Sequence, residues 1–313
     1  MTDRLPFWLI KKTGREQGGF GKSGIDIHNV KTILREYGLN TVCESAKCPN
    51  IIECFSKPTA TFMILGSVCT RGCGFCSVEK ITPFVKGGSA GIKGYPVPPS
   101  DDEPLRVAEA SLKMGLRHVV ITSVSRDDLP DKGAGQFANT INAVKIINKK
   151  ATVEVLTPDF SGSFELIKKV AESMPEIYNH NIETVPRLYK KVRPQADYNR
   201  SLNLLRIVKE FYPDIITKSG IMVGLGEEKD EVIGVMKDLR VMGCDVLTIG
   251  QYLMPTKKNL PVIKYIEPEI FDYYKKDGEK MDFKSVESGP FVRSSYNASV
   301  IVSKSQSIKV MRY

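Results

Sequence analysis

The chain has 313 residues, 42% of them hydrophobic and 26% charged, which is typical of a globular protein with one or two domains and excludes collagen-like and disordered chains. No segment approaches the roughly 18 uninterrupted apolar residues of a membrane span, and an acid and a proline stand where a secretory signal would begin, so we expect a cytoplasmic protein without a membrane partner. The net charge of +9 favours anionic partners, but it does not choose among nucleic acid, an acidic protein and a phosphorylated ligand.

Apolar, β-branched runs alternate with amphipathic helical stretches after about residue 58, which is the pattern of βα units on a parallel sheet. The runs are almost continuously apolar, as expected of strands that are buried on both faces. In chain order we expect strand 60–68, helix 102–114, strand 118–124, helix 135–149, strand 152–158, helix 164–173, strand 177–185, helix 200–211, strand 216–226, helix 229–242, strand 246–253 and helix 267–281.

Six βα units can close in part into a barrel, in which the chemistry lies at the carboxyl ends of the strands. We therefore expect an α/β fold built on a partial (β/α)6 barrel of the TIM type. The expected division is an N-terminal extension over 1–58, the barrel over 59–281 and a C-terminal tail over 282–313.

Six of the seven cysteines lie within residues 43–76. Without an export signal, such clustering indicates metal ligation before disulfides. Cys69, Cys73 and Cys76 follow the first strand with the spacing C-x3-C-x2-C. A structural zinc site uses four ligands, whereas a [4Fe–4S] cluster held by three cysteines keeps one iron free for another ligand. A zinc site or a redox-sensing thiol cluster is the alternative.

This motif, its place after the first strand and the βα repeat resemble the radical S-adenosylmethionine (SAM) superfamily. The resemblance implies that the free iron binds the amino and carboxylate groups of SAM. It also implies that Phe75, which precedes the third cysteine, lies near the adenine. Residues 122–129 resemble a family stretch at the SAM end of the barrel and make Ser123 a candidate SAM contact.

Polar residues interrupt two of the apolar strands, namely Glu154 in one and Asn181 and Glu183 in the other. Burial of such side chains without partners is costly, so a barrel interior that faces SAM or substrate would satisfy them. A hydrogen-bonded core network is the alternative. The run from Gly220 to Glu227 resembles the fifth strand against which radical SAM proteins lay the nucleoside, although an ordinary strand that ends in a turn would also fit.

A second set of cysteines precedes the first strand: Cys43, Cys48 and Cys54, spaced C-x4-C-x5-C. Together with the Arg-Ser-Ser-Tyr sequence over 293–296, this set resembles the lipoyl synthase family of radical SAM enzymes. In that family the three cysteines hold an auxiliary [4Fe–4S] cluster, and the second serine of the tail, here Ser295, is the fourth ligand. A cluster that only pins the extension to the barrel is the alternative.

An extended segment would support one ligating serine, because adjacent side chains would then point to opposite faces and only one of Ser294 and Ser295 could reach the iron. An oxygen ligand should also be easier to displace than a thiolate, since soft sulfur ligands are favoured at such clusters. Arg293 is the candidate for orienting the substrate or the serine.

The resemblance implies insertion of two sulfur atoms at carbons 6 and 8 of an octanoyl chain, with two SAM molecules and two [4Fe–4S] clusters, of which the auxiliary one is consumed. The implied partners are octanoylated lipoyl domains of 2-oxoacid dehydrogenase complexes or the glycine cleavage H protein, an electron donor such as flavodoxin or ferredoxin, and an iron–sulfur cluster carrier. Nucleic acid is not expected. The alternatives are a radical SAM methylthiotransferase, which lacks the tail motif, and a metal carrier, which would not bind SAM.

Overall fold

The computed structural model describes residues 5–10, 27–45, 50, 58–81 and 95–295. Within them one sheet has the strand order β1-β2-β5-β6-β7-β8-β9-β10. β1 is antiparallel to β2, and every later neighbour pairs in parallel. The strands are β1 (Asn40–Thr41), β2 (Thr59–Ile64), β5 (His118–Ser123), β6 (Thr152–Leu156), β7 (Ile177–Asn179), β8 (Ile216–Val223), β9 (Val246–Gln251) and β10 (Ser285–Gly289), with a separate pair β3 (Val68–Cys69) and β4 (Glu79–Lys80).

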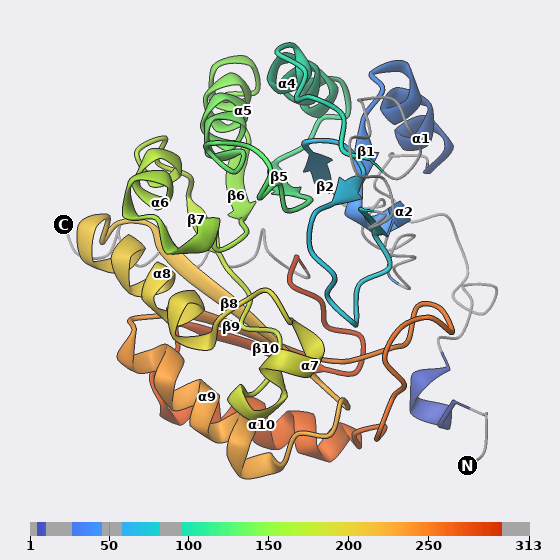
Figure 1. Ribbon diagram of the computed structural model, residues 1–313, viewed down its shortest axis with the longest axis vertical. Helices are drawn as coiled ribbons and strands as arrows, with labels where there is room; N and C mark the ends of the chain where they lie inside the picture. The colour runs from blue at the N-terminus through green and yellow to red at the C-terminus, as the bar shows by residue number, and fades with distance from the viewer. Residues whose placement is uncertain (1–4, 11–26, 46–49, 51–57, 82–94, 296–313) are drawn as a thin grey trace.

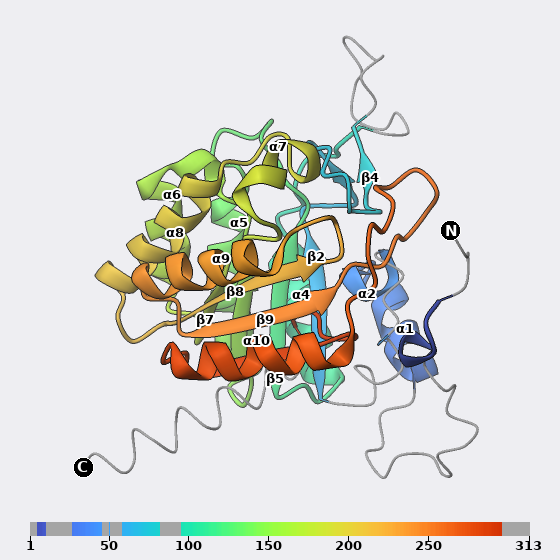
Figure 2. The same ribbon diagram turned by 90° about the horizontal axis from the view of Figure 1, so that it is seen from below.

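The helices are α1 (Ile27–Glu36), α2 (Val42–Ser45), α4 (Glu103–Lys113), α5 (Ala134–Ile147), α6 (Phe164–Ala171), α7 (Tyr189–Val192), α8 (Tyr198–Phe211), α9 (Lys229–Val241) and α10 (Pro268–Lys280), with 3-10 turns at Phe7–Leu9, Phe160–Gly162 and Pro186–Leu188. The longer helices α4, α5, α6, α8, α9 and α10 cover the outer face of the sheet (Figure 1). Figure 2 shows the same molecule from below, with α9 and α10 on either side of the strands β8 and β9 in that view. In the described ranges, no helix is both long and apolar enough to span a membrane.

The sheet is a partial barrel, as the sequence predicts. Its strand order begins at β1 and ends at β10, and these two strands are not paired with each other. Figure 1 shows the strands as an arc with the helices outside and the end of the described chain, in red, inside. The strands are buried on both faces: in β5 the consecutive residues Val119, Val120 and Ile121, whose side chains alternate between the two faces, are all fully buried. We therefore expect the functional site inside the arc of strands, where the end of the described chain also lies (Figure 1).

The sheet contains two more strands than the six that we expected. β1 comes from the N-terminal extension, and β10 comes from the tail, where Ser285 pairs with Val246 and Gly289 with Gly250. The sequence of β10 lacks an apolar run, and only Val286 in it is buried. Both flanking segments thus continue the sheet.

All six expected strands end before their predicted last residue, and β2 and β7 do so by the largest margin. β2 ends at Ile64, where Leu65 and Gly66 adopt φ values of +67° and +89°. β7 ends at Asn179, and Glu183 further on has φ +70°. A left-handed backbone costs a residue other than glycine of the order of 1–3 kcal/mol. The expected strand 177–185 is therefore a short strand followed by a strained loop.

Side-chain caps explain where several of the expected helices begin. Ser163 accepts a hydrogen bond from the Leu166 amide at the start of α6, and Asp197 accepts one from the Arg200 amide at the start of α8. α9 begins with a reciprocal capping box between Glu228 and Glu231. Such caps satisfy amide groups that have no partner inside the helix. The six expected helices are present, with ends shifted by no more than two residues.

Candidate active site

A cavity of about 460 Å³ lies inside the barrel. This volume is in the range of small-molecule sites. The cavity brings together predicted residues from the N-terminal extension, the cysteine loop, the strand ends and the tail. Those residues are Cys43, Phe75, Cys76, Asn181, Glu183, Arg293 and Ser295.

The loop of Cys69, Cys73 and Cys76 is held by segments far away in the sequence. The Gly74 amide donates to the Val192 carbonyl (2.9 Å), and the Leu260 amide donates to the Gly74 carbonyl (3.0 Å). A Cβ atom at Gly74 would lie 2.8 Å from the Leu260 side chain. Glycine is required here because the loop passes so close to its neighbour.

The three thiols of this loop are free and half-buried. Burial raises the pKa of Cys73, and nearby Arg193 only partly offsets that effect. Burial likewise raises the pKa of Cys76 to about 11, and the charges of Cys73 and Cys69 add to the shift. The thiols therefore lie close enough to repel one another as thiolates, and a bound cation would favour their ionised form.

This donor set fits an iron–sulfur cluster. Cys69, Cys73 and Cys76 offer three free thiols on one loop, and thiolates are the soft ligands that such clusters use. A [4Fe–4S] cluster carries each thiolate on a different iron. Cys69, Cys73 and Cys76 would hold such a cluster, and its positive iron would offset the raised pKa values.

Asn181 links the loop after β7 to the tail. Its Nδ2 donates to Glu183 Oε1 (3.0 Å) and to Ser294 Oγ (2.6 Å). Its Oδ1 is buried with no partner among the described residues. Gly220 leaves room for the amide, because a Cβ atom there would lie 2.9 Å from Oδ1. An orphaned acceptor at a cavity wall fits a polar ligand such as SAM.

The structure places Glu154 in a core network instead of the cavity. The side chain is fully buried, and Lys218 Nζ donates to its Oε1 (2.9 Å) and Oε2 (3.2 Å). Asn179 also donates to it (3.1 Å), and His118 Nε2 lies 3.4 Å away. Burial alone would raise the pKa of Glu154, but Lys218 and His118 outweigh it and lower the pKa. These contacts support the alternative interpretation of Glu154, which is a hydrogen-bonded core network.

Ser123 does not line the cavity either. It is the last residue of β5, and its Oγ is buried without a partner in the described part of the chain. Phe75, the other residue that the resemblance assigns to SAM, does line the cavity. Of the four predicted SAM contacts, the cavity wall therefore contains Phe75 and Asn181.

The tail enters the cavity after β10. Ser294 and Ser295 form a turn, and both line the cavity. The segment is therefore not extended, and the argument from opposite faces of an extended segment does not apply to these two serines. Gly250 admits the tail, because a Cβ atom there would lie 2.1 Å from the Val292 carbonyl oxygen. The structure distinguishes the two serines by Asn181, which engages only Ser294.

The described residues of the N-terminal extension reach the same place. Cys43 lies in α2 and lines the cavity, and Asn50 Nδ2 donates to the Phe291 carbonyl of the tail (2.7 Å). Cys48 and Cys54 are outside the described residues. The extension and the tail thus meet beside the predicted auxiliary site.

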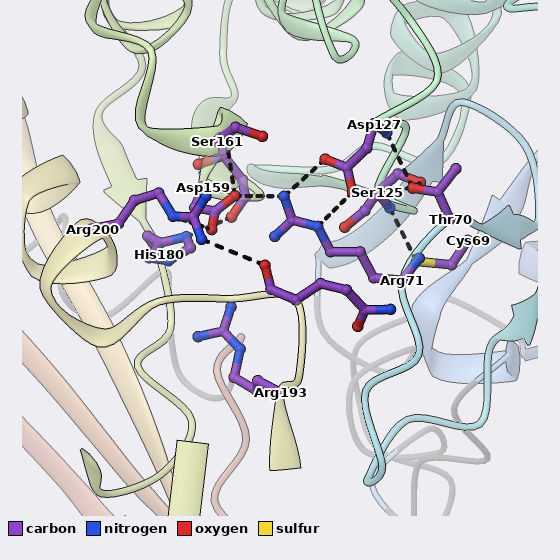
Figure 3. A network of polar contacts seen from close by, with 12 residues as sticks. Cys69, Thr70, Arg71, Ser125, Asp127, Asp159, Ser161, His180, Arg193 and Arg200 are labelled. Atoms are coloured by element: carbon purple, nitrogen blue, oxygen red, sulfur yellow. Dashed lines mark hydrogen bonds and ion pairs between the residues drawn. The ribbon is translucent and has the colours of Figure 1, made fainter. Parts of the chain in front are cut away.

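Two buried arginines escaped the sequence analysis. Arg193 Nη1 donates to the carbonyls of Asn181 (2.9 Å) and Ile182 (3.2 Å). Arg71, inside the cysteine motif, lies between Asp127 and Asp159 (Figure 3). One indication of this contact is present in the sequence: Arg71 lies in the cysteine motif over 69–76, and Asp127 lies in the family stretch over 122–129.

Comparison with known proteins agrees with the fold and the cysteine loop. The family model "Radical SAM superfamily" matches residues 63–239. The solved structure of methylornithine synthase has a TM-score of 0.52 at 15% identity and covers 84% of this chain and 75% of its own. A maturase of the [FeFe]-hydrogenase has a TM-score of 0.57 at 13% identity and covers 88% and 67%. The chain is thus a radical SAM protein.

Relatives at much higher identity narrow this class. The "Lipoyl synthase" of Caldanaerobacter subterraneus subsp. tengcongensis is 54% identical over 300 residues, which cover 96% of this chain and 98% of that protein. The "Lipoyl synthase" of Alkaliphilus metalliredigens is 51% identical over 306 residues, 98% of each chain. The chain belongs to the lipoyl synthase family. It is accordingly a radical SAM enzyme of sulfur insertion, with SAM and a [4Fe–4S] cluster as cofactors.

Proposed function

We propose that the enzyme inserts two sulfur atoms, at carbons 6 and 8 of an octanoyl chain on a lysine of a lipoyl carrier domain. The observation that carries this proposal is that one cavity is lined by both predicted cluster sites, with Cys76 from one set and Cys43 and Ser295 from the other. Sulfur insertion needs this proximity, because hydrogen is removed from the same carbon that then receives sulfur.

The proposed reaction uses two [4Fe–4S] clusters and two molecules of SAM. One cluster is held by Cys69, Cys73 and Cys76, and the auxiliary cluster is held by Cys43, Cys48, Cys54 and Ser295. When bound, the first supplies the electron that cleaves SAM, and the second supplies the sulfur and is consumed. The protein supplies position and a cavity that excludes water.

The residues of the cavity wall have distinct tasks in this proposal. Asn181 Oδ1, which lacks a partner among the described residues, accepts a hydrogen bond from SAM. Phe75 packs against the adenine. Burial raises the pKa of Glu183, and the charge of Arg193 and the hydrogen bond from Asn181 offset only part of that rise, so a cationic group of the bound ligand would help to keep this side chain ionised. Arg293, which lines the same cavity, orients the octanoyl chain or Ser295.

The proposed substrates are octanoylated lipoyl domains of 2-oxoacid dehydrogenase complexes or the glycine cleavage H protein. The electron donor is a flavodoxin or ferredoxin, and an iron–sulfur cluster carrier rebuilds the auxiliary cluster. The net charge of +9 supports docking of acidic partner proteins of this kind. The methylthiotransferase alternative is not favoured, because relatives matched over nearly the whole chain carry the name lipoyl synthase.

An anaerobic assay tests the proposal with SAM, dithionite and an octanoyl-lysine peptide. The reconstituted wild type should contain about eight irons per chain, as two clusters require, and should form 6-thiooctanoyl peptide and then lipoyl peptide. SAM cleavage without sulfur in the peptide, from protein that carries both clusters, would contradict the proposal.

A further inference from the structure

The sulfur of Cys69 lies where two loops of the chain meet. Its Sγ accepts from the backbone amide of Arg71 (3.4 Å) and from the backbone amide of Ser125 (3.3 Å). The first amide belongs to the cysteine loop itself, but the second belongs to the loop that follows β5. The environment of the sulfur therefore depends on how these two loops are held together.

Thr70 joins the two loops directly. Its amide donates to the Ser125 carbonyl (3.0 Å), and its hydroxyl donates to the same carbonyl (2.9 Å). The Asp127 amide in turn donates to Thr70 Oγ1 (3.1 Å). These bonds hold the Ser125 carbonyl and the Asp127 amide against Thr70, and so they keep the segment that carries the Ser125 amide beside the cysteine loop.

Arg71 completes the connection (Figure 3). Its Nε and Nη2 donate to the two oxygens of Asp127 (2.7 and 2.8 Å), and Nη2 also donates to Asp159 (2.7 Å). Its side chain is 5% exposed, and that of Asp159 is fully buried. A planar guanidinium that pairs with a carboxylate through two bonds fixes orientation as well as distance.

Arg71 and Arg200 together balance the charges of Asp127 and Asp159, since Arg200 Nε lies 3.2 Å from the second oxygen of Asp159. Burial alone would raise the pKa of Asp159, but the hydrogen bond and charge of Arg71 outweigh it and lower the pKa to about 2. Arg71 faces two carboxylates, so its charge is already compensated. Its effect on the nearby thiolates is therefore more geometric than electrostatic.

We propose that Thr70, Arg71 and Asp127 form a positioning clamp that raises the reduction potential of the cluster at Cys69, Cys73 and Cys76. The clamp holds the Ser125 and Arg71 amides on the Cys69 sulfur. Hydrogen bonds to cluster sulfurs set such potentials, and donors stabilise the reduced form because it is more negative by one electron. That electron comes from the external donor of the proposed function, on which this inference rests.

A redox titration followed by electron paramagnetic resonance tests the clamp. The parent is the full chain with Cys43, Cys48 and Cys54 replaced by alanine, so that only one cluster titrates. Thr70→Val removes the hydroxyl bonds, whereas Thr70→Ser keeps them and is the matched control. Arg71→Lys keeps the charge but loses the two-bond pairing. We expect Thr70→Val and Arg71→Lys to lower the one-electron reduction constant about tenfold, a shift of about 59 mV.

Arg200→Gln provides a second control. Arg200 Nε lies 3.2 Å from the far oxygen of Asp159, and this change leaves the pairing of Arg71 with Asp127 in place. Its potential should equal that of the parent. Equal potentials for Thr70→Val and Thr70→Ser would overturn the clamp. So would failure of Thr70→Val to bind iron where Thr70→Ser binds it, since the contacts would then serve assembly. Absence of iron in the parent would refute the proposed function instead.

Discussion

Asp159 shows how a single buried residue makes stability depend on pH. Its pKa is about 2 in the fold, against 3.8 ordinarily, so folding favours the charged form. The corresponding stability, of order 2 kcal/mol, is present above about pH 4 and is lost as the pH falls toward 2. We expect acid unfolding of the metal-free protein to be less steep between pH 4 and 2 for Asp159→Asn. An unchanged slope in circular dichroism titrations would contradict this.

Glu154 tests the difference between a core network and a ligand site. Glu154→Gln leaves Lys218, which is fully buried, without its counter-ion. We expect a loss of roughly 3–5 kcal/mol in unfolding free energy. The double variant Glu154→Gln, Lys218→Met should recover most of it and bind SAM as the wild type does. Weakened SAM binding by a stable double variant, measured by calorimetry, would indicate instead that Glu154 contacts SAM.

Ser294 and Ser295 give matched variants of adjacent residues. We expect Ser295→Ala to lose iron from the auxiliary cluster, because the hydroxyl is its proposed ligand. Ser294→Ala should keep both clusters, because its hydroxyl is engaged by Asn181. Iron and sulfide quantitation after anaerobic reconstitution measures the difference. The reverse pattern would assign the ligand to Ser294.

At the scale of elements, β10 carries the tail into the barrel because β9 has a glycine where the two meet. Gly250→Ala would place a Cβ atom 2.1 Å from the Val292 carbonyl oxygen, which must then move. We expect the variant to retain about four irons per chain, since the loop of Cys69 is untouched but Ser295 is displaced. Gly234→Ala in α9, where a Cβ atom meets nothing within 4 Å, is the control. Eight irons in both variants would show that the auxiliary site tolerates the shift.

Some strands could be predicted from the sequence and others could not. β5 and β9 could be predicted because a strand buried on both faces is an apolar run, and nearly every residue of these two strands is buried. β10 was not visible, since its stability comes from pairing with β9 and only Val286 is buried. The strained turn at Glu183 was hidden for a similar reason. Its backbone is dictated by tertiary contacts, which leave no local signal.

At the scale of the whole molecule, the spacing of the cysteines predicts the two cysteine sets, but the tertiary fold determines which residues line the same cavity. The motif predicted Cys69, Cys73 and Cys76 as a unit, yet nothing in it predicted the contact of Arg71 with Asp159 across 88 positions. The tail motif predicted a serine near the extension, and the structure brings Ser295 and Cys43 to one cavity. Long-range pairings of this kind follow from topology, which residue spacing does not encode.

We propose that the inserted sulfur comes from a cluster held by Cys43 and Ser295 beside the SAM cavity. The most direct test is reconstitution of the protein with isotopically heavy sulfide, removal of free sulfide, and a single turnover with SAM and octanoyl-lysine peptide. Mass spectrometry should find two heavy sulfurs in the lipoyl product of the wild type and none with Cys43→Ala, which should still cleave SAM. Light sulfur in the wild-type product, or heavy lipoyl product from Cys43→Ala, would contradict the account.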